Sequence, residues 1–302
     1  MNRSWGVSAR VQTCRGDACL VALIVLGSGG LVQADFDPAN PPQGLFEDHY
    51  YAVQLQGRKC GYARIAARRE GEVIRSLNYV NIEIRRGPVP LKIVVKSVHR
   101  ESLDGRAQGF EAEQYTSMMT IKYKGTISDG RLRLVIEQGD QQTVRTYRWD
   151  PRAHLAWRSL LAMRRRGLRV GDQFDLLAYD VLVRPDAPIP THLKVLAHET
   201  IDLLGSKVQA YSVESTVELG MKLTTLSWLR DDGVPLISTV SLGFLKLRLV
   251  RCPRAFALQD LDPPELFAAT LIRADRPIDA RRADRVVYRL SLPGGMGQLE
   301  LP

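Results

Sequence analysis

From Tyr50 onward, apolar side chains recur at every second position rather than at helical spacing. The run from Leu91 to Val98 follows this alternation, with Lys92 and Lys96 on one side of the strand. Strict alternation is typical of a strand with one buried face and one wet face. Asp-Gly pairs, which tolerate the positive φ values of tight hairpin turns, interrupt these runs at 104–105, 129–130 and 232–233. The sequence therefore predicts a mainly β protein, with antiparallel strands connected as a meander.

One segment departs from this alternation and has the features of a helix over 151–166. Asp150 is a capping residue type, Pro151 suits the first helical position, and Gly167 supplies a left-handed stop. Its basic C-terminal residues would interact favourably with the negative end of the helix dipole. The apolar face and the basic end consist of Ala153, Trp157, Leu160 and Leu161, and of Arg164, Arg165 and Arg166. Trp157 fits either a ligand pocket or plain core. The arginine triplet fits either a patch for acidic lipid or polymer, or a solvated helix end.

This helix divides a β-rich domain at 49–258 into two halves, 49–149 and 172–258. We expect a strongly curved antiparallel sheet or open barrel of about ten to thirteen strands, or two packed β-halves, with this one principal helix. Residues 35–48 are expected to form a linker. The last segment, 259–302, is expected to be a connector with closing strands and a short helix from Pro263 to Ala269.

The first thirty-four residues have the composition of a secretory leader. A basic n-region precedes the apolar run from Ala18 to Leu31, and a small-residue site places cleavage between Ala34 and Asp35. The apolar run is shorter than a spanning helix needs and contains three glycines. We therefore expect a protein exported to the periplasm or cell envelope, with a retained N-terminal anchor as the alternative.

The chain is basic, and its charge is dispersed. The net charge is +9, and removing a leader that holds three arginines and one aspartate lowers it from +9 to +7. Dispersed positive charge favours loose attraction to anionic surfaces such as lipid headgroups or envelope polymers. Nucleic acid is not an expected partner, because an exported protein does not normally meet it.

Cys60 raises the question of a cysteine nucleophile. His99 and Asp104 follow it in the order of a cysteine-histidine-aspartate triad. However, the alternation places Cys60 on a strand rather than at a helix start, where a thiol pKa is lowered. We interpret Cys60 as a small apolar residue of a strand. Asp231 and Asp232 lie in a predicted hairpin turn and have a structural interpretation there. The sequence predicts no catalytic residue and no cofactor.

Cys252 is the other cysteine that follows the leader. An oxidising compartment permits a disulfide between Cys60 and Cys252, and two free buried thiols are equally compatible with the sequence. No metal site is predicted, because His192, His198 and Glu199 fall short of a closed ligand set.

Several stretches resemble the N-terminal β-rich region of exported bacterial proteins of the transglutaminase-like superfamily. These are HYYAVQLQGRKCGYARIAARREG at 49–71, ESLDGR at 101–106, RRRGLRVGDQF at 164–174, LLGSKVQAYSV at 203–213, LSWLRDDGVPL at 226–236 and LIRADRPIDARRADRVVYRL at 271–290. The last stretch resembles the connector that, in that family, leads into a papain-like core with cysteine, histidine and aspartate. The sequence reaches Pro302 soon after this stretch, so the resemblance implies an envelope β-domain without that core.

Two function hypotheses follow, and an active transglutaminase-like or cysteine protease enzyme is disfavoured. The first is a non-catalytic domain of the cell envelope that positions an envelope protein or a substrate polypeptide. The second is an apolar-ligand binder that holds a lipid or acyl chain in a half-closed sheet. The second predicts adaptable apolar side chains facing a pocket. The candidates are Met118, Met119, Met163, Met221, Phe244 and Leu245.

Overall fold

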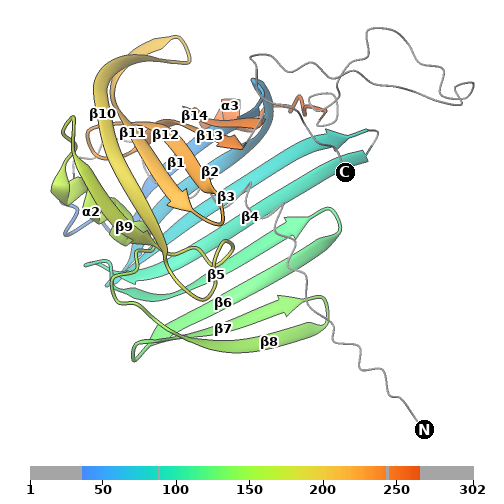
Figure 1. Cartoon of the computed structure of the whole chain (residues 1–302), viewed down its shortest axis with the longest axis vertical. Coiled ribbons are helices and arrows are strands. Elements are labelled where there is room, and N and C mark those ends of the chain that lie inside the picture. The colour runs from blue at the N-terminus through green and yellow to red at the C-terminus, as the bar shows by residue number, and fades with distance from the viewer. Residues whose placement is uncertain (1–35, 88, 243–244, 266–302) are drawn as a thin grey trace, which may run out of the picture. The chain divides into compact units, whose positions relative to one another are not determined.

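The computed structural model describes residues 36–87, 89–242 and 245–265. Within them, fourteen strands form one antiparallel sheet whose two end strands are not hydrogen-bonded to each other, so the sheet is curved but open (Figure 1). The prediction of a mainly β protein with a strongly curved antiparallel sheet and one principal helix is confirmed. The strands are fourteen, against about ten to thirteen expected, and only the first half begins earlier than predicted.

The strands alternate in direction along the chain, and most of them are joined by short turns. Their bounds are β1 (Gly44–Leu55), β2 (Arg58–Glu70), β3 (Val73–Arg86), β4 (Val89–Ser102), β5 (Ala107–Thr116), β6 (Met119–Ser128), β7 (Arg131–Gln138), β8 (Gln141–Arg148), β9 (Gln173–Ala178), β10 (Ile189–Leu203), β11 (Ser206–Glu218), β12 (Lys222–Leu229), β13 (Pro235–Leu242) and β14 (Leu245–Cys252). All three predicted Asp-Gly turns connect neighbouring strands. Between β6 and β7, Asp129 and Gly130 have φ values of 50° and 68°, as a two-residue turn of type I′ requires.

Strand β1 lies inside the sheet rather than at an edge. Strands β2 to β8 follow it on one side, and β14 back to β9 follow it on the other. The pairing of β1 with β14 runs from Tyr50 opposite Cys252 to Leu55 opposite Leu247. The two predicted halves therefore share one continuous sheet instead of packing as two layers. The edge strands β8 and β9 are consecutive in the sequence, and the principal helix lies between them.

The alternation directs one set of side chains into the hollow of the sheet. Tyr51 and Val53 of β1 and Ile93 of β4 face inward and are at most 4% exposed. The segment after β9 packs into the same cluster through Tyr179 and Leu182. The hollow is therefore filled largely by the chain itself.

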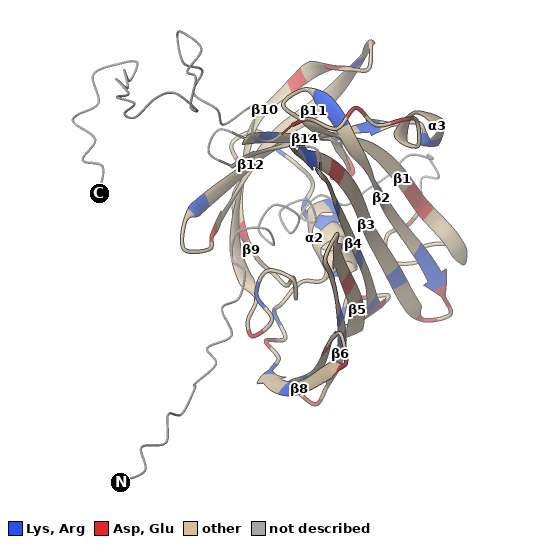
Figure 2. Ribbon diagram, turned by 90° about the vertical axis from the view of Figure 1, so that its right-hand side faces the viewer, with Lys and Arg blue, Asp and Glu red and all other residues tan. Residues whose placement is uncertain are grey.

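The principal helix, α2 (Ala156–Arg166), lies in this hollow and packs against both halves of the sheet (Figure 2). Trp157, which is 1% exposed, packs in a cluster with Ile74 of β3. Met163 packs in another cluster with Val213 of β11. Trp157 is therefore a core residue. A second helix of one turn, α3 (Arg254–Ala257), packs on the opposite, outer face of the sheet.

The start of α2 differs from the predicted position. The side chain of Asp150 accepts a hydrogen bond from the backbone N–H of Arg152 at 2.9 Å, so residues 150–153 form a separate turn. The helix is capped instead by Glu101 of β4, whose carboxylate accepts the backbone N–H groups of Trp157 and Arg158 at 2.7 and 3.0 Å. A cap from a distant strand satisfies the free donors of the first helical turn. It leaves no signal near the helix in the sequence.

Two predicted boundaries are wrong. Residues 44–48, expected in a linker, are the first five residues of β1. The short helix expected from Pro263 does not form over 263–265. Instead, the backbone N–H of Arg85 donates to the carbonyl of Pro264, and Glu265 forms an isolated parallel β-bridge with Arg85. The predicted leader at 1–34, the cleavage site, and the connector from 266 onward lie outside the described residues. Of the helices in the described part, none is long and apolar enough to cross a membrane.

Candidate functional site

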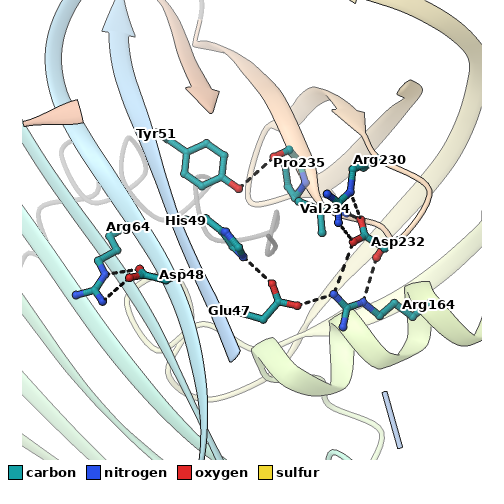
Figure 3. Close-up of polar contacts among 10 residues, drawn as sticks. All are labelled: Glu47, Asp48, His49, Tyr51, Arg64, Arg164, Arg230, Asp232, Val234 and Pro235. Atoms are coloured by element: carbon teal, nitrogen blue, oxygen red, sulfur yellow. Dashed lines mark hydrogen bonds and ion pairs between the residues drawn. The ribbon is translucent and has the colours of Figure 1, made fainter. Parts of the chain in front are cut away.

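A group of buried and partly buried charged side chains lies where β1, β14, α2 and the β12–β13 turn meet (Figure 3). One carboxylate oxygen of Glu47 lies 2.6 Å from Nε2 of His49, and the other accepts a hydrogen bond from Arg164 at 2.6 Å. Nε of Arg164 donates to the backbone carbonyl of Asp232 at 3.3 Å, and Asp232 is ion-paired with Arg230. These contacts tie α2 to β1 and to the β12–β13 turn. We call this group the inner ionic cluster; it comprises Glu47, His49, Arg164, Arg230, Asp232 and Arg251.

The pKa values of the cluster favour a carboxylate beside a neutral imidazole. Burial acts to raise the pKa of Glu47, but the hydrogen bond from His49 and the charge of Arg164 together hold it below its ordinary value. Burial lowers the pKa of His49, against the opposing effect of Glu47. At neutral pH, Nε2–H of a neutral His49 therefore donates to an ionised Glu47.

Arg251 of β14 adds a positive charge that these ion pairs leave unbalanced. It lies opposite Tyr51 in the register of β1 and β14 and is 2% exposed. Burial lowers the pKa of Arg251 to about 10, so the guanidinium stays protonated at neutral pH. Its two terminal nitrogens have no hydrogen-bond partner among the described residues. A water molecule or a small anion is the matching acceptor for such buried donors.

The sequence contains a usable signal for this cluster, which the prediction of a linker concealed. Glu47 and His49 have the same parity along β1 as the buried Tyr51 and Val53. Extending the alternation backward from Tyr51 places both on the inner face. The linker predicted for 35–48 left Glu47 outside the strand, so burial of the pair was not expected.

The residues considered for a cysteine triad are not brought together. Cys60 lies next to Gly61 on β2. Gly61 pairs with Ile82 of β3, and Ile82 pairs with Ile93 in the first half of β4. His99 is six residues further along β4, which corresponds to roughly 20 Å. Burial raises the pKa of the Cys60 thiol to about 12, so it is not a thiolate at neutral pH. Burial also lowers the pKa of His99 to about 4.

The two cysteines are free and lie on opposite faces of the sheet. Cys60 belongs to the inner apolar cluster with Val53, and its Sγ lies 3.6 Å from the carbonyl of Val53. Cys252 packs on the outer face with Ala52 and Ala257 of α3. The sheet itself separates the two thiols, so of the two alternatives compatible with the sequence the structure has the free thiols.

The histidines of β10 occupy separate surface sites. His192 contacts Asp175 of β9 at 2.8 Å, and His198 stacks on Tyr211 with ring centroids 4.4 Å apart. Glu199 instead accepts a hydrogen bond from the indole of Trp228 at 2.9 Å. Within the described part of the chain, no group of three or more histidine, cysteine, aspartate or glutamate side chains is placed to hold a metal ion.

The methionines do not line a common pocket. Met118, Met119 and Met221 are 95%, 40% and 63% exposed, so the prediction that they face inward is wrong for these three. They lie at or beside the β5–β6 and β11–β12 turns, where a side chain has no facing layer. Met163 is buried, Leu245 is partly buried, and the side chain of Phe244 lies outside the described residues.

The basic triplet at the end of α2 divides among three environments. Arg164 is buried in the inner ionic cluster. Arg166 contacts Asp172 at 3.7 Å and lies over the ring of Phe174. Arg165 is exposed on the outer side of the helix. The triplet is therefore not one patch.

The two edges of the sheet differ in how they are covered. Along β9, the backbone N–H of His154 donates to the carbonyl of Leu177 at 2.7 Å, and the N–H of Tyr179 donates to the carbonyl of His154 at 2.9 Å. Strand β8 ends the sheet order at the other edge, and every residue in it except Tyr147 is exposed. Among the described residues, no strand pairs with the outer edge of β8.

Comparisons with known proteins bear on the fold only. No family model matches the chain, and no curated protein matches it. A matching solved structure is the "Beta-barrel-like Protein of Domain of Unknown Function DUF1849" from Brucella abortus, with 13% sequence identity and a TM-score of 0.50. The alignment covers 70% of this chain and 97% of that chain. At this identity the likeness shows a shared barrel-like fold, and the resemblance to transglutaminase-like proteins stays a prediction.

Proposed function

We propose that this protein is a non-catalytic binding module of the cell envelope, which holds an extended segment of a partner polypeptide by adding it as a strand beside β8. The observation that carries the proposal is the open edge of β8, which contrasts with the edge of β9, where His154 bridges the end of the strand at Ala178. An open edge offers a row of backbone donors and acceptors to an incoming strand.

The edge at β8 lacks most devices that protect sheets from unwanted pairing. The strand has no proline and no glycine, and its pairing with β7 has no register shift. Its sequence, QQTVRTYR, includes β-branched and aromatic residues that favour an extended strand. A regular edge of this kind pairs readily with another extended chain.

The charge beside this edge favours a partner segment with acidic side chains. Arg131 of β7 lies directly opposite Arg148 of β8, and Arg133 lies opposite Thr146. Alternation places Arg131, Arg133 and Arg148 on the same face. Among the described residues, none of the three has an ion-pair partner within 4.0 Å. Like charges placed opposite each other destabilise a strand pair, so a neighbouring carboxylate would relieve this repulsion.

The packing of the hollow weighs against the alternative of an acyl-chain binder. Between α2 and the inner face of the sheet, two cavities have volumes of about 20 and 50 Å³. Pockets for drug-sized ligands usually measure roughly 300–1,000 Å³. An acyl chain would have to displace part of the inner core. Strand addition at β8 requires no such rearrangement.

The test is hydrogen exchange on the protein isolated gently from its own cell envelope together with the polypeptide that co-purifies. We expect the complex to protect amides of β8 relative to the same protein after the partner is removed. Only alternate residues direct their N–H toward the open edge, so about half of the β8 amides should gain protection. Protection confined to other strands, or a protein that carries no partner, would overturn the proposal.

Proline substitutions at 143, 144, 145 and 146 make the test sharper. Of these four positions, the two whose backbone N–H points to the open edge should weaken partner binding at little cost in stability, because proline there removes a donor that β7 does not use. The other two should lower stability, because they remove hydrogen bonds to β7. Binding that is unchanged in all four variants would contradict strand addition.

A further inference from the structure

A groove of about 410 Å³ lies outside α2, between the helix, the β4–β5 turn and the turn that precedes the helix. We call it the α2 groove. It is lined by Asp104, Gly105, Arg106, Pro151, His154, Arg158, Leu161, Ala162 and Arg165.

The walls of the α2 groove are fixed to each other by buried contacts. Glu101, at the end of β4, caps the helix, and the indole N–H of Trp157 donates to the carbonyl of Leu103 at 2.9 Å. Gly105 has a φ of +85°, and a Cβ at this position would lie 3.0 Å from Cβ of Arg158. The β4–β5 turn therefore packs directly on the helix. The side chains lining the groove are held by a preorganised frame.

The lining of the groove carries an excess of positive charge. It contains the guanidinium groups of Arg106, Arg158 and Arg165, against the single carboxylate of Asp104. That carboxylate is already engaged by the hydroxyl of Ser102. Arg106 is only weakly paired with Asp104, at 3.6 Å. The formal charge of the lining is +2 with a neutral histidine.

Donors for a ligand remain in the groove after its internal contacts are counted. Arg158 uses one terminal nitrogen to donate to the carbonyls of Pro151 and Ala153. The side chain of Arg165 has no ion pair and no hydrogen bond to another described residue. Nδ1 of His154 is buried and has no partner among the described residues. Burial and the charge of Arg158 lower the pKa of His154 to about 4, so the imidazole is neutral at physiological pH.

We propose that the α2 groove binds a phosphate group, held by Arg106, Arg158 and Arg165. Guanidinium groups bind phosphate oxygens through paired N–H donors, and several together favour a doubly charged anion. The groove is open to solvent, so the same chemistry admits the headgroup of an anionic phospholipid or a soluble phosphate compound. This site is separate from β8 and does not rest on the proposed strand addition.

The test compares two double variants with the same change in net charge. The groove variant is Arg106→Gln with Arg165→Gln, and both side chains are exposed, so the fold should be retained. The control is Arg169→Gln with Arg184→Gln, which are exposed residues outside the groove lining. Thermal unfolding of all three proteins checks that each is folded.

The probes are inorganic phosphate, measured by calorimetry, and phosphatidylcholine vesicles with or without phosphatidylglycerol, measured by sedimentation. We expect the groove variant to lose roughly tenfold or more in affinity, because it loses two charged donors, and the control to stay within about twofold of the natural protein. Saturable binding of inorganic phosphate would identify a soluble source, and binding only to phosphatidylglycerol vesicles would identify a lipid source. Equal weakening of both variants, or no binding of either probe, would overturn the proposal.

Discussion

The substitution Glu101→Gln tests whether a buried carboxyl group on β4 couples the stability of the protein to pH. Glu101 is 0% exposed and caps α2 through the backbone N–H groups of Trp157 and Arg158. Burial raises the pKa of Glu101 from 4.5 to about 7, against the opposing effect of these hydrogen bonds and of the Arg158 charge. A glutamine keeps one oxygen acceptor for the helix and does not titrate.

The sign of the effect follows from the raised pKa. The folded protein holds the Glu101 proton more tightly than the unfolded chain does. The stability that results is complete below about pH 4.5 and is lost as the pH rises through about 7. At about 1.4 kcal/mol per pKa unit, the loss over this window is about 3 kcal/mol.

Urea unfolding of the natural protein and the glutamine variant measures this loss directly. The free energy of unfolding would be determined for both proteins at several values between about pH 4 and 8. Other buried groups such as His99 titrate in both proteins, so their contributions cancel in the difference. We expect the natural protein to lose about 3 kcal/mol relative to the variant across this range. Two curves that stay parallel would refute the reasoning.

Three further predictions concern the interior of the sheet. Arg164→Met should lower the free energy of unfolding by about 3–5 kcal/mol in urea titrations, because it leaves Glu47 buried without its cation; Glu47→Gln in the same chain should recover part of the loss, and an additive double variant would contradict the pairing. Gly61→Ala should cost more than about 2 kcal/mol, because its Cβ would lie 2.0 Å from the carbonyl oxygen of Asn81; a thermal midpoint equal to that of the natural protein would count against this close approach. Cys60 should resist iodoacetamide at about pH 8 in the folded protein and react after unfolding, as measured by mass spectrometry; rapid labelling of the native thiol would be inconsistent with its burial.

The β class of the fold was predictable because its causes are local. Alternation between Leu91 and Val98 follows from the two-residue repeat of a strand, and Ile93 and Val95 do face the core. Asp129 and Gly130 adopt positive φ because that turn type requires it. Such features depend on a few neighbouring residues.

The helix shows where local reasoning fails. Its apolar face and its end at Arg166 were readable, but its start was placed too early, at Pro151 with Asp150 as the cap. The residue that caps it, Glu101, lies more than fifty positions before the helix. Only the packing of the β4–β5 turn against α2 brings the two together.

The candidate sites were mostly beyond the sequence for a similar reason. Cys60 and Cys252 looked compatible with a bond, but Cys60 on β2 packs in the inner cluster and Cys252 on β14 packs on the outer face. The α2 groove joins Arg106 with Arg165, which are far apart in the chain. Glu47 and His49 were the exception, because their parity along β1 already indicated burial.

By itself, the sequence determined the strand repeat, the Asp-Gly turns and the presence of one principal helix, since backbone propensity and side-chain alternation act over a few residues. Only the tertiary structure decided that β1 pairs with β14, that His154 bridges the end of β9 while β8 is open, and that three adjacent arginines enter three environments. These outcomes depend on contacts between segments far apart in the chain. Such contacts form only when the whole sheet has curved around α2.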